Sequence, residues 1–428
     1  MILVLLGGGA AGWLAHRIRT QRRAIAAVRA AGGQVSYDWQ AVAVGTANGR
    51  KVRQTEPAAP AWLRRWLGDE PFQQVTSVRC EAPIPRGALP DFLAAVGRFE
   101  GLQSLTLGPL DGEGEGFAHL RGLGRLERVW LGGPGIDDAA LGHLAAIRSL
   151  RDVGIGRRLS PRDRTPTTGA NSPTNAGFAR LAAATKLQSL AIDDCPNLTD
   201  ATLARLVAAM PALRAFGLTG GPPTVAATLA ALGKHPDLES LGLDRTGVAD
   251  ADLAAVAGLT RLHGVSLQGT GIGDAGIAHL RGLQGVRELL VNGTLVGDSG
   301  LEVVGGLMSL EGFYASKTRI TDAGIPHLAR LAKLRELAIG LNDLTDAAMP
   351  PLAGLAGLER LDLTRTPALT DAGLAPLRAL TKLKRLAITR SRVTPEGIAA
   401  LQQAVPSLTR VTTQEPAARP APAAPPAR

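Results

Sequence analysis

The stretch LTRLHGVSLQGTGIGDAGIAHL at Leu259–Leu280 recurs along the chain and decides the fold. Close copies are LMSLEGFYASKTRITDAGIPHL at Leu307–Leu328 and LAGLERLDLTRTPALTDAGLAPL at Leu355–Leu377. One aspartate marks each copy, at a spacing of 24 residues and, at the last step, of 25: Asp250, Asp274, Asp298, Asp322, Asp346 and Asp371. Self-similarity at a fixed period of this length indicates a solenoid of stacked repeats.

Each segment of the repeat has a physical role. The pattern L-x-x-L-x-L alternates apolar and polar residues, which predicts a short strand with one buried face. Thr-Asp or Gly-Asp further on supplies an N-cap and an acid in the first helical turn. The spacing Leu-x-x-Leu-x-x-Leu then predicts a helix of two to three turns. A single strand and helix cannot bury their apolar faces alone, whereas stacked copies can.

A small polar residue follows each strand by two positions. Its side chain can satisfy backbone groups where the chain leaves the strand. The residues at this position are Cys195, Thr246, Thr270, Thr294, Thr318, Asn342, Thr366 and Ser391.

These repeats resemble the leucine-rich-repeat family over about residues 75–412. The phrase ITDAG at Ile320–Gly324 is similar to the Thr-Asp-x-Gly repeats of the cysteine-containing, ribonuclease-inhibitor-like subclass, and Cys195 in CPNLTD stands where that subclass has its cysteine. The stretches VRAAGGQVSYDW and WLRRWLGDEPFQQV resemble the lead-in of planctomycete leucine-rich-repeat proteins with an N-terminal anchor. The resemblance implies an α/β solenoid (horseshoe) of about 12 repeats of 24 residues that binds another macromolecule. Parallel strands would form its concave face and short helices its convex face.

Residues 2–15 form a long apolar run, followed by a basic segment with Arg17, Arg19, Arg22 and Arg23. As a helix the run would rise about 21 Å, short of a hydrocarbon core of roughly 30 Å. Extension through Ile18, with arginine side chains reaching the interface, would close part of the gap. We therefore favour a single-pass membrane anchor over a cleaved signal peptide, which would need a basic start, and over a soluble N-terminus. The positive charge after the run favours the cytoplasmic side for the repeats.

The predicted organisation has four parts. Residues 1–31 form a membrane anchor and basic helical stalk, 32–74 an N-terminal cap, 75–412 the solenoid, and 413–428 a disordered Pro/Ala tail. Within the solenoid, residues 156–174 (GRRLSPRDRTPTTGANSPT) interrupt one repeat. Their polar, basic and proline-containing composition predicts an unstructured insertion.

The composition agrees with a thin, layered core. Apolar residues make up 45% of the 428 residues, but aromatic residues only 3%, so Leu, Ala and Val supply most of the core. The net charge of +10 gathers in residues 1–65, which hold about ten Arg and Lys against two acids. A nucleic-acid site needs its charge on the binding surface, so the sequence disfavours a nucleic-acid partner. The excess of Arg over Lys, with abundant Ala, Gly and Pro, is typical of bacterial proteins from GC-rich genomes.

The sequence contains no catalytic motif in a suitable context. Four histidines recur at one position of the repeat, which indicates surface residues: His119, His143, His279 and His327. No carboxylate or thiolate set converges on them, and Cys80 and Cys195 lie in no paired or nucleophile motif. The chain is therefore predicted to have no catalytic residues, no metal site and no cofactor.

The concave face is the predicted binding surface. Its middle row is the residue between the last two apolar positions of each strand: Thr106, Trp130, Gly154, Ala191, Gly217, Gly242, Ser266, Leu290, Tyr314, Ala338, Asp362 and Ala387. Most are small, and exposed aromatic residues often anchor interfaces. The large exceptions Trp130, Leu290 and Tyr314, with the polar Ser266 and Asp362, are the candidate binding residues.

The predicted function is a membrane-tethered, non-enzymatic protein-interaction module or scaffold whose partner is a protein. The alternative is a substrate-recognition subunit of an enzyme complex, such as a ubiquitin-ligase-like receptor. Residues 1–74 do not show the pattern of a helical adaptor-binding domain, which such a receptor would need.

A second row of each strand tests the register. The residues at this position alternate in sign over five repeats: Arg287, Glu311, Arg335, Glu359 and Lys384. In parallel strands paired in register, they should form one ladder in which opposite charges flank each charge. A slipped register would place like charges together.

The anchor hypothesis yields the first testable prediction. Removal of residues 1–18 should move the protein from the membrane fraction to the soluble fraction of a gentle lysate, because it removes the long apolar run. The far-ultraviolet circular dichroism of the repeats should stay unchanged. Full-length protein recovered in the soluble fraction would contradict the anchor.

Overall fold

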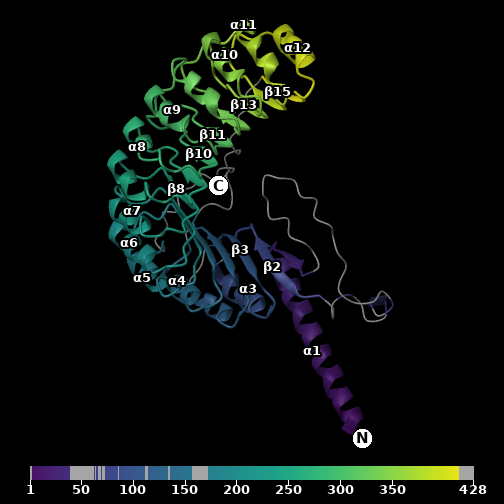
Figure 1. Cartoon of the computed structure of the whole chain (residues 1–428). Coiled ribbons are helices and arrows are strands. Elements are labelled where there is room, and N and C mark those ends of the chain that lie inside the picture. Colours follow the sequence, from purple (N-terminus) through teal and green to yellow (C-terminus); the bar gives the residue numbers. More distant parts are fainter. Residues whose placement is uncertain are drawn as a thin grey trace, which may run out of the picture. The chain divides into compact units, whose positions relative to one another are not determined.

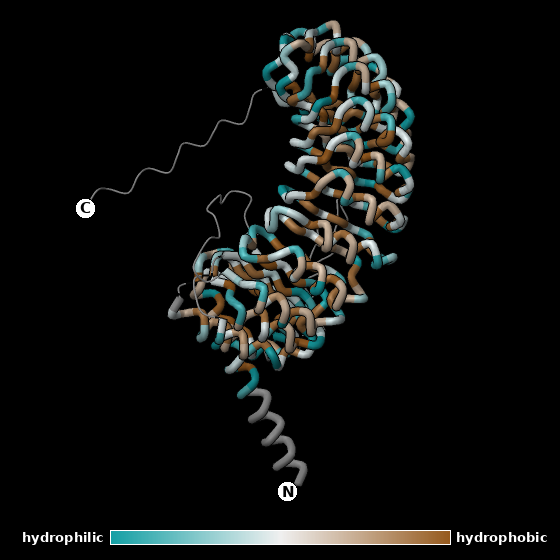
Figure 2. Tube along the Cα trace, turned by 90° about the vertical axis from the view of Figure 1, so that its left-hand side faces the viewer, coloured by the Kyte–Doolittle hydropathy of each residue, from teal (hydrophilic) through white to brown (hydrophobic). Residues whose placement is uncertain are grey.

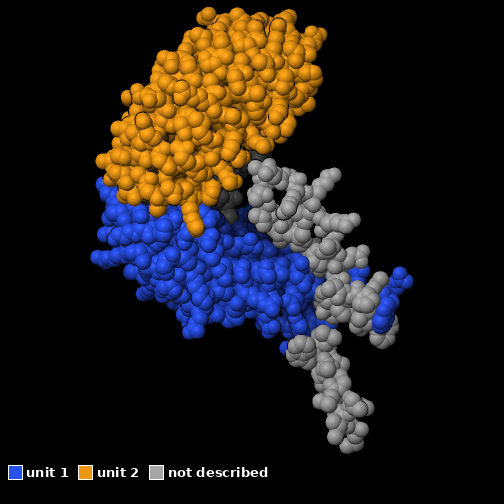
Figure 3. All heavy atoms as spheres, viewed as in Figure 1, with its two compact units in different colours: residues 1–240 blue, residues 241–428 orange. Residues whose placement is uncertain are grey.

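The computed structural model describes residues 2–38, 62, 64–65, 69, 73–84, 86–110, 114–133, 135–156 and 172–413. The chain divides into two compact units, residues 1–240 and 241–428, coloured blue and orange in Figure 3. In each unit a short strand and a short helix alternate along the chain (Figure 1). Apolar segments recur at each turn of the chain (Figure 2), as the repeat pattern predicts.

The strands of the first unit follow one another in chain order in its sheet. They are β1 (Gln34–Tyr37), β2 (Val75–Cys80), β3 (Ser104–Pro109), β4 (Arg128–Gly132), β5 (Asp152–Ile155), β6 (Ser189–Asp193) and β7 (Ala215–Thr219). β1 pairs with β2 in antiparallel orientation, and each pair from β2 to β7 is parallel.

The helices of the first unit connect these strands. They are α1 (Ile2–Ala30), η2 (Arg86–Ala88), α3 (Leu89–Val96), η3 (Gly114–Leu120), α4 (Asp138–Ala145), α5 (Asn175–Leu181), α6 (Asp200–Ala208) and α7 (Ala226–Leu232). The end of α1 packs against α3 and β1, where Ala24, Ile25 and Val28 are buried. The basic segment predicted as a stalk thus contributes buried residues that cover the first repeat.

The strands of the second unit also follow chain order and pair in parallel from β9 onward. They are β8 (Ser240–Asp244), β9 (Gly264–Ser266), β10 (Glu288–Leu290), β11 (Gly312–Tyr314), β12 (Glu336–Ala338), β13 (Arg360–Asp362), β14 (Arg385–Ala387) and β15 (Arg410–Thr412). The helices between them are η4 (Asp250–Val256), α8 (Asp274–Ala278), α9 (Asp298–Val304), η5 (Ile325–Arg330), η6 (Asp346–Ala348), α10 (Met349–Leu352), α11 (Asp371–Leu374), η7 (Pro376–Ala379) and α12 (Pro395–Ala404).

This architecture is the α/β leucine-rich-repeat solenoid that the sequence predicts. Parallel strands one repeat apart pair in register, and the middle residue of each short strand is buried, as with Leu289 and Phe313. From β2 to β15 the described residues contain 14 such strands, because the apolar frame extends into weaker copies at both ends. We call the side of the sheet opposite the helices the strand face.

The predicted charge ladder is present. The backbone N–H of Arg335 donates to the carbonyl of Glu311, and that of Glu359 donates to the carbonyl of Arg335, each at 2.8 Å. The Glu359 carboxylate lies 3.5 Å from the Arg335 guanidinium and 2.6 Å from the Lys384 ammonium. Lys384, named as the first cause, lowers the pKa of Glu359. The register prediction is confirmed.

The polar residues after each strand also act as predicted. The hydroxyls of Thr246, Thr270 and Thr366 each donate to the carbonyl three residues earlier, at 2.8, 2.6 and 2.7 Å. The side-chain amide of Asn342 donates to two carbonyls, those of Ile339 and of Ala315 one repeat earlier. These bonds satisfy backbone oxygens inside the core, where an unpaired group would be costly.

The repeated aspartates act differently from the prediction, which assigned them to their own helix. Thr370 is the N-cap of α11, and its side chain accepts from Ala372. Asp346, one repeat earlier, accepts from both the backbone N–H and the hydroxyl of Thr370, at 2.8 and 2.6 Å. The carboxylate thus joins one repeat to the next. We call this contact the aspartate joint; it recurs from Asp138, Asp250, Asp274, Asp298, Asp322 and Asp371.

The glycine of the Thr-Asp-x-Gly phrase makes room for this joint. A Cβ at Gly397 would lie 2.1 Å from Oδ1 of Asp371, the aspartate of the preceding repeat. The same crowding by an aspartate of the preceding repeat occurs at Gly276, Gly300, Gly324 and Gly373. The steric demand of the joint therefore explains why glycine follows at this position.

The helices of the second unit are shorter than the two to three turns predicted. α10 and α11 have four residues each, and η5 and η7 are 3-10 helices. Pro326 and Pro376 lie in the first turns of these 3-10 helices, and Pro350 and Pro351 in α10. Proline fixes φ and cannot donate a backbone hydrogen bond, which favours short helical segments.

The outcome for the predicted termini is mixed. By its length and hydropathy, no helix among the described residues could span a bilayer, so the predicted membrane anchor has no support from the structure. The predicted tail, apart from residue 413, and residues 157–171 of the predicted insertion lie outside the described residues. The insertion ends at Thr174, the N-cap of α5, whose N–H and hydroxyl donate to Asp138.

The aspartate joint predicts strong coupling between Gly397 and Asp371. Replacement of Gly397 by Ala should destabilise the protein by about 1–3 kcal/mol, because the added Cβ clashes with the carboxylate. In an Asp371→Ala background the same replacement should cost much less, as chemical denaturation of the four proteins of the cycle would measure.

Gly271→Ala is the matched control for this cycle. A Cβ at Gly271 meets no atom within 4 Å, so the change should be close to neutral. Additive effects of the Gly397 and Asp371 substitutions would contradict the role assigned to the joint.

Candidate functional site

The five predicted binding residues lie on the strand face, but in different units. Ser266, Leu290 and Tyr314 are paired in register on β9, β10 and β11, and Asp362 lies on β13. Trp130 lies on β4 of the first unit. All five are half-buried, so the two aromatic residues are less exposed than predicted. Contacts along the sheet explain this difference.

Trp130 lies over a glycine of the neighbouring strand. Its register partner on β5 is Gly154, and a Cβ there would lie only 2.1 Å from Cε3 of the indole. The indole therefore occupies the space that a side chain on β5 would fill. This contact explains why Trp130 is half-buried on an otherwise open face.

Tyr314 makes a similar contact within its own strand. A Cβ at Gly312 would lie 3.1 Å from Cε2 of the tyrosine ring, so the ring extends over that glycine. The phenol donates a hydrogen bond of 2.7 Å to Glu336 on β12. Glu336 also lies 2.7 Å from the guanidinium of Arg360 on β13. Three neighbouring strands thus fix the position of the aromatic ring.

This environment raises the pKa of Tyr314 above its ordinary value. Burial is the main cause, and the hydrogen bond to the Glu336 carboxylate adds to it. Both effects favour the neutral phenol, because the anion would be desolvated next to a negative charge. Tyr314 therefore serves as a hydrogen-bond donor on this face.

Ser266 belongs to a polar network at the end of the strands. Its hydroxyl donates to Asp244, which also accepts from the backbone N–H of Gln268 at 3.0 Å. The side chain of Gln268 accepts from Asn292 at 2.9 Å, and Asn292 accepts from the backbone N–H of Ser316 at 2.8 Å. The network links β8 to the end of β11. Ser266 is thus already bonded within the chain.

Tyr314 and Asp362 share a hollow on the strand face of β11 to β15. Its volume is about 350 Å³, and Ala338 and Ala387 lie between the larger side chains that line it. Asp362 accepts a hydrogen bond of 2.8 Å from the backbone N–H of Thr364, which fixes its carboxylate. The structure thus brings together two of the five predicted residues around one concavity.

Sequence reasoning missed the arginines that border this hollow. Arg360, Arg385 and Arg410 are register partners on β13, β14 and β15, and all three are exposed. We call them the arginine row. Their spacing of 25 residues is visible in the sequence. The prediction followed the middle row and the charge ladder, and so did not examine the first residue of each strand.

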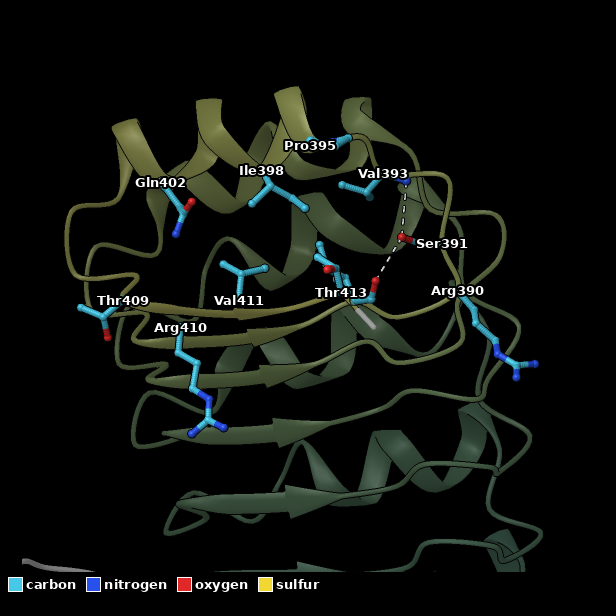
Figure 4. A pocket seen from close by; sticks show the side chains of 11 residues that line it. Arg390, Ser391, Val393, Pro395, Ile398, Gln402, Thr409, Arg410, Val411 and Thr413 are labelled. Atoms are coloured by element: carbon cyan, nitrogen blue, oxygen red, sulfur yellow. Dashed lines mark hydrogen bonds between the residues drawn. The ribbon is translucent and has the colours of Figure 1, made fainter. Parts of the chain in front are cut away.

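A second hollow, of about 560 Å³, lies at the end of the second unit, between α12 and β15 (Figure 4). Val411 and Ile398 face one another across it, whereas Arg410 points away from α12. The Ser391 hydroxyl donates to the carbonyl of Ile388 at 3.3 Å on one side of this hollow. Arg410 contributes to both hollows.

The cysteines and potential metal ligands have structural surroundings. Burial, with the nearby Asp193 and Asp194, raises the pKa of Cys195 to about 12, and burial raises that of Cys80. Such thiols are poor nucleophiles at neutral pH. In the part of the chain that the structure describes, no three His, Cys, Asp or Glu side chains are placed to hold a metal ion.

Comparison with solved structures returns leucine-rich-repeat proteins. An internalin of Listeria monocytogenes (inlF) is 16% identical, with 80% of this chain and 87% of that chain covered and a TM-score of 0.45. Listeria internalin C2 is 25% identical over 50% of this chain and 84% of its own, with a TM-score of 0.38. A leucine-rich-repeat protein of Leptospira interrogans is 13% identical over 74% and 91%, with a TM-score of 0.41.

No protein-family model and no curated protein matches the sequence. The fold assignment therefore rests on the strand register and repeat spacing of this chain. The resemblance to the cysteine-containing subclass and to planctomycete proteins stays a prediction from the sequence.

The Tyr314–Glu336 contact predicts a specific titration. In an alkaline titration followed at 295 nm, Glu336→Gln should shift the Tyr314 step to lower pH, because the carboxylate that raises its pKa is removed. The step should remain above the ordinary value, since the phenol stays buried. Tyr314→Phe identifies this step by removing it; an unmoved step in the Glu336 variant would show that the contact is absent in solution.

Proposed function

We propose that the chain is a protein-interaction module that binds a macromolecular partner with the strand face of β9 to β15. One observation carries the proposal: this face presents an in-register row of half-buried side chains, including Leu290 and Tyr314, beside a hollow of about 350 Å³. Such residues can be buried further by a partner, and partly buried aromatic and aliphatic anchors are common at interfaces.

The fixed positions of these side chains support the proposal. Tyr314 is held by Gly312 and Glu336, and Ser266 by Asp244. Side chains ordered before binding lose little rotamer freedom in a complex. The small residues Ala338 and Ala387 between them allow a partner to approach the sheet closely.

We further propose that the chain acts by binding and not by catalysis. The raised pKa values of both thiols and the assignment of Ser266 and Tyr314 to internal hydrogen bonds support this. Attachment to a membrane is a separate proposal that rests on the sequence of residues 2–23 alone. Its test is the deletion of residues 1–18.

A photo-crosslinking amino acid at Leu290 should trap the partner in cells, whereas the same group at Arg281 should not. Arg281 is exposed and follows α8 on the helix side. Leu290→Arg should also reduce recovery of the trapped partner at least tenfold, because it places a charge in the interface core. Thermal unfolding should confirm that both variants remain folded. Preferential crosslinking from Arg281 would reject the strand face as the binding surface.

A further inference from the structure

We infer that the arginine row binds an acidic, extended segment of a partner protein; this inference rests on the proposed interaction function and names the class of partner. The segment would place carboxylates on Arg385 and Arg410 and an apolar side chain in the hollow beside Tyr314. The inference begins from a break in the charge pattern of the strand face.

Elsewhere on this face, neighbouring strands pair opposite charges. Glu359 lies between Arg335 and Lys384, and Glu336 contacts Arg360. Across β13, β14 and β15 the rule fails, because three arginines are direct register partners. Like charges at directly opposed positions destabilise a sheet. The fold gains nothing from this run, whereas a negatively charged ligand would.

Two of the three arginines are open to such a ligand. Arg360 is already engaged by Glu336, which is itself bonded to Tyr314. Arg385 and Arg410 are exposed, and neither has an ion-pair or hydrogen-bond partner from its side chain among the described residues. A guanidinium can bind a carboxylate through two parallel hydrogen bonds, which gives direction as well as charge.

The geometry fits an extended peptide. Strands lie about 4.8 Å apart, so the backbones of Arg360 and Arg410 are separated by about 10 Å. In an extended segment, alternate side chains are roughly 6.8 Å apart and point the same way. Two acidic residues separated by one residue can therefore reach Arg385 and Arg410 together. A neighbouring apolar residue would lie over Ala338 and Ala387, the small residues of the hollow.

The surrounding charges favour a peptide over a nucleic acid. The carboxylates of Glu336, Glu359 and Asp362 lie on the same face as the arginine row. A polyphosphate backbone that crossed several strands would meet these negative charges. An acidic pair on a short peptide can contact the arginines alone. The match is thus local in charge, which is typical of protein–protein recognition.

The test uses selection from a displayed library of random linear peptides on the full-length protein. We expect the selected peptides to be enriched in Asp or Glu at positions two apart. In fluorescence anisotropy, the best labelled peptide should bind the double variant Arg385→Gln/Arg410→Gln at least tenfold more weakly. Its affinity should also fall as salt is raised.

The matched control is Arg281→Gln/Arg330→Gln, which removes the same charge from two exposed arginines on the helix side. It should bind the peptide like the wild type. Equal loss in both double variants would reduce the effect to net charge and overturn the inference, as would selected peptides without acidic residues. Tighter binding of a single-stranded oligonucleotide than of the peptide would overturn it in favour of nucleic acid.

These outcomes are separate from the proposed function. If Leu290 traps a partner whose recovery is unchanged in Arg385→Gln/Arg410→Gln, the strand face binds but the arginine row does not recognise the ligand. If neither crosslinking nor selection finds a ligand on this face, both proposals fail together.

Discussion

The fold depends on a contact that each repeat makes with its successor. The carboxylate of an aspartate in one helical turn accepts hydrogen bonds from the N-cap residue of the next repeat, as Asp346 does from Thr370. The first N–H groups of a helix have no partner inside the helix, so another chain segment must satisfy them. Here the threonine hydroxyl caps its own helix, while the aspartate holds that threonine in place. One residue pair thus sets both the start of the helix and the spacing of the stack.

Strand pairing on one side and aspartate joints on the other fix each repeat against the next. The joint also explains a variation in the sequence: Asn175 takes the place of aspartate, and its Oδ1 still accepts from the N–H of Thr199 at 2.9 Å. The insertion before α5 leaves the stack intact for the same reason, since Thr174 is bonded to Asp138. Chain length between a strand and its helix can therefore vary as long as the capping residue returns to its aspartate.

The sequence predicted most of the fold because the relevant forces act at fixed spacing. Apolar residues that recur every 24 positions can be buried only in register, and the threonines after the strands have backbone carbonyls within reach. The partner of each aspartate was not predictable in the same way, since Thr-Asp is equally suited to a contact within one helix. Only the stacking decides between these partners. The site was predicted in part: Tyr314 and Asp362 do share a hollow, but the arginine row emerges only when strand partners are compared position by position.

Gly312 has a consequence for the energetics of recognition that extends beyond its own strand. Because it lacks a side chain, the ring of Tyr314 can extend over it and reach Glu336. The aromatic group is therefore immobilised in the free protein, and the entropic penalty of ordering it falls on folding rather than on complex formation. Complexes formed on this surface should accordingly owe their lifetime to slow dissociation from a rigid template. A glycine with no contact to the ligand would in this way set the residence time of the complex.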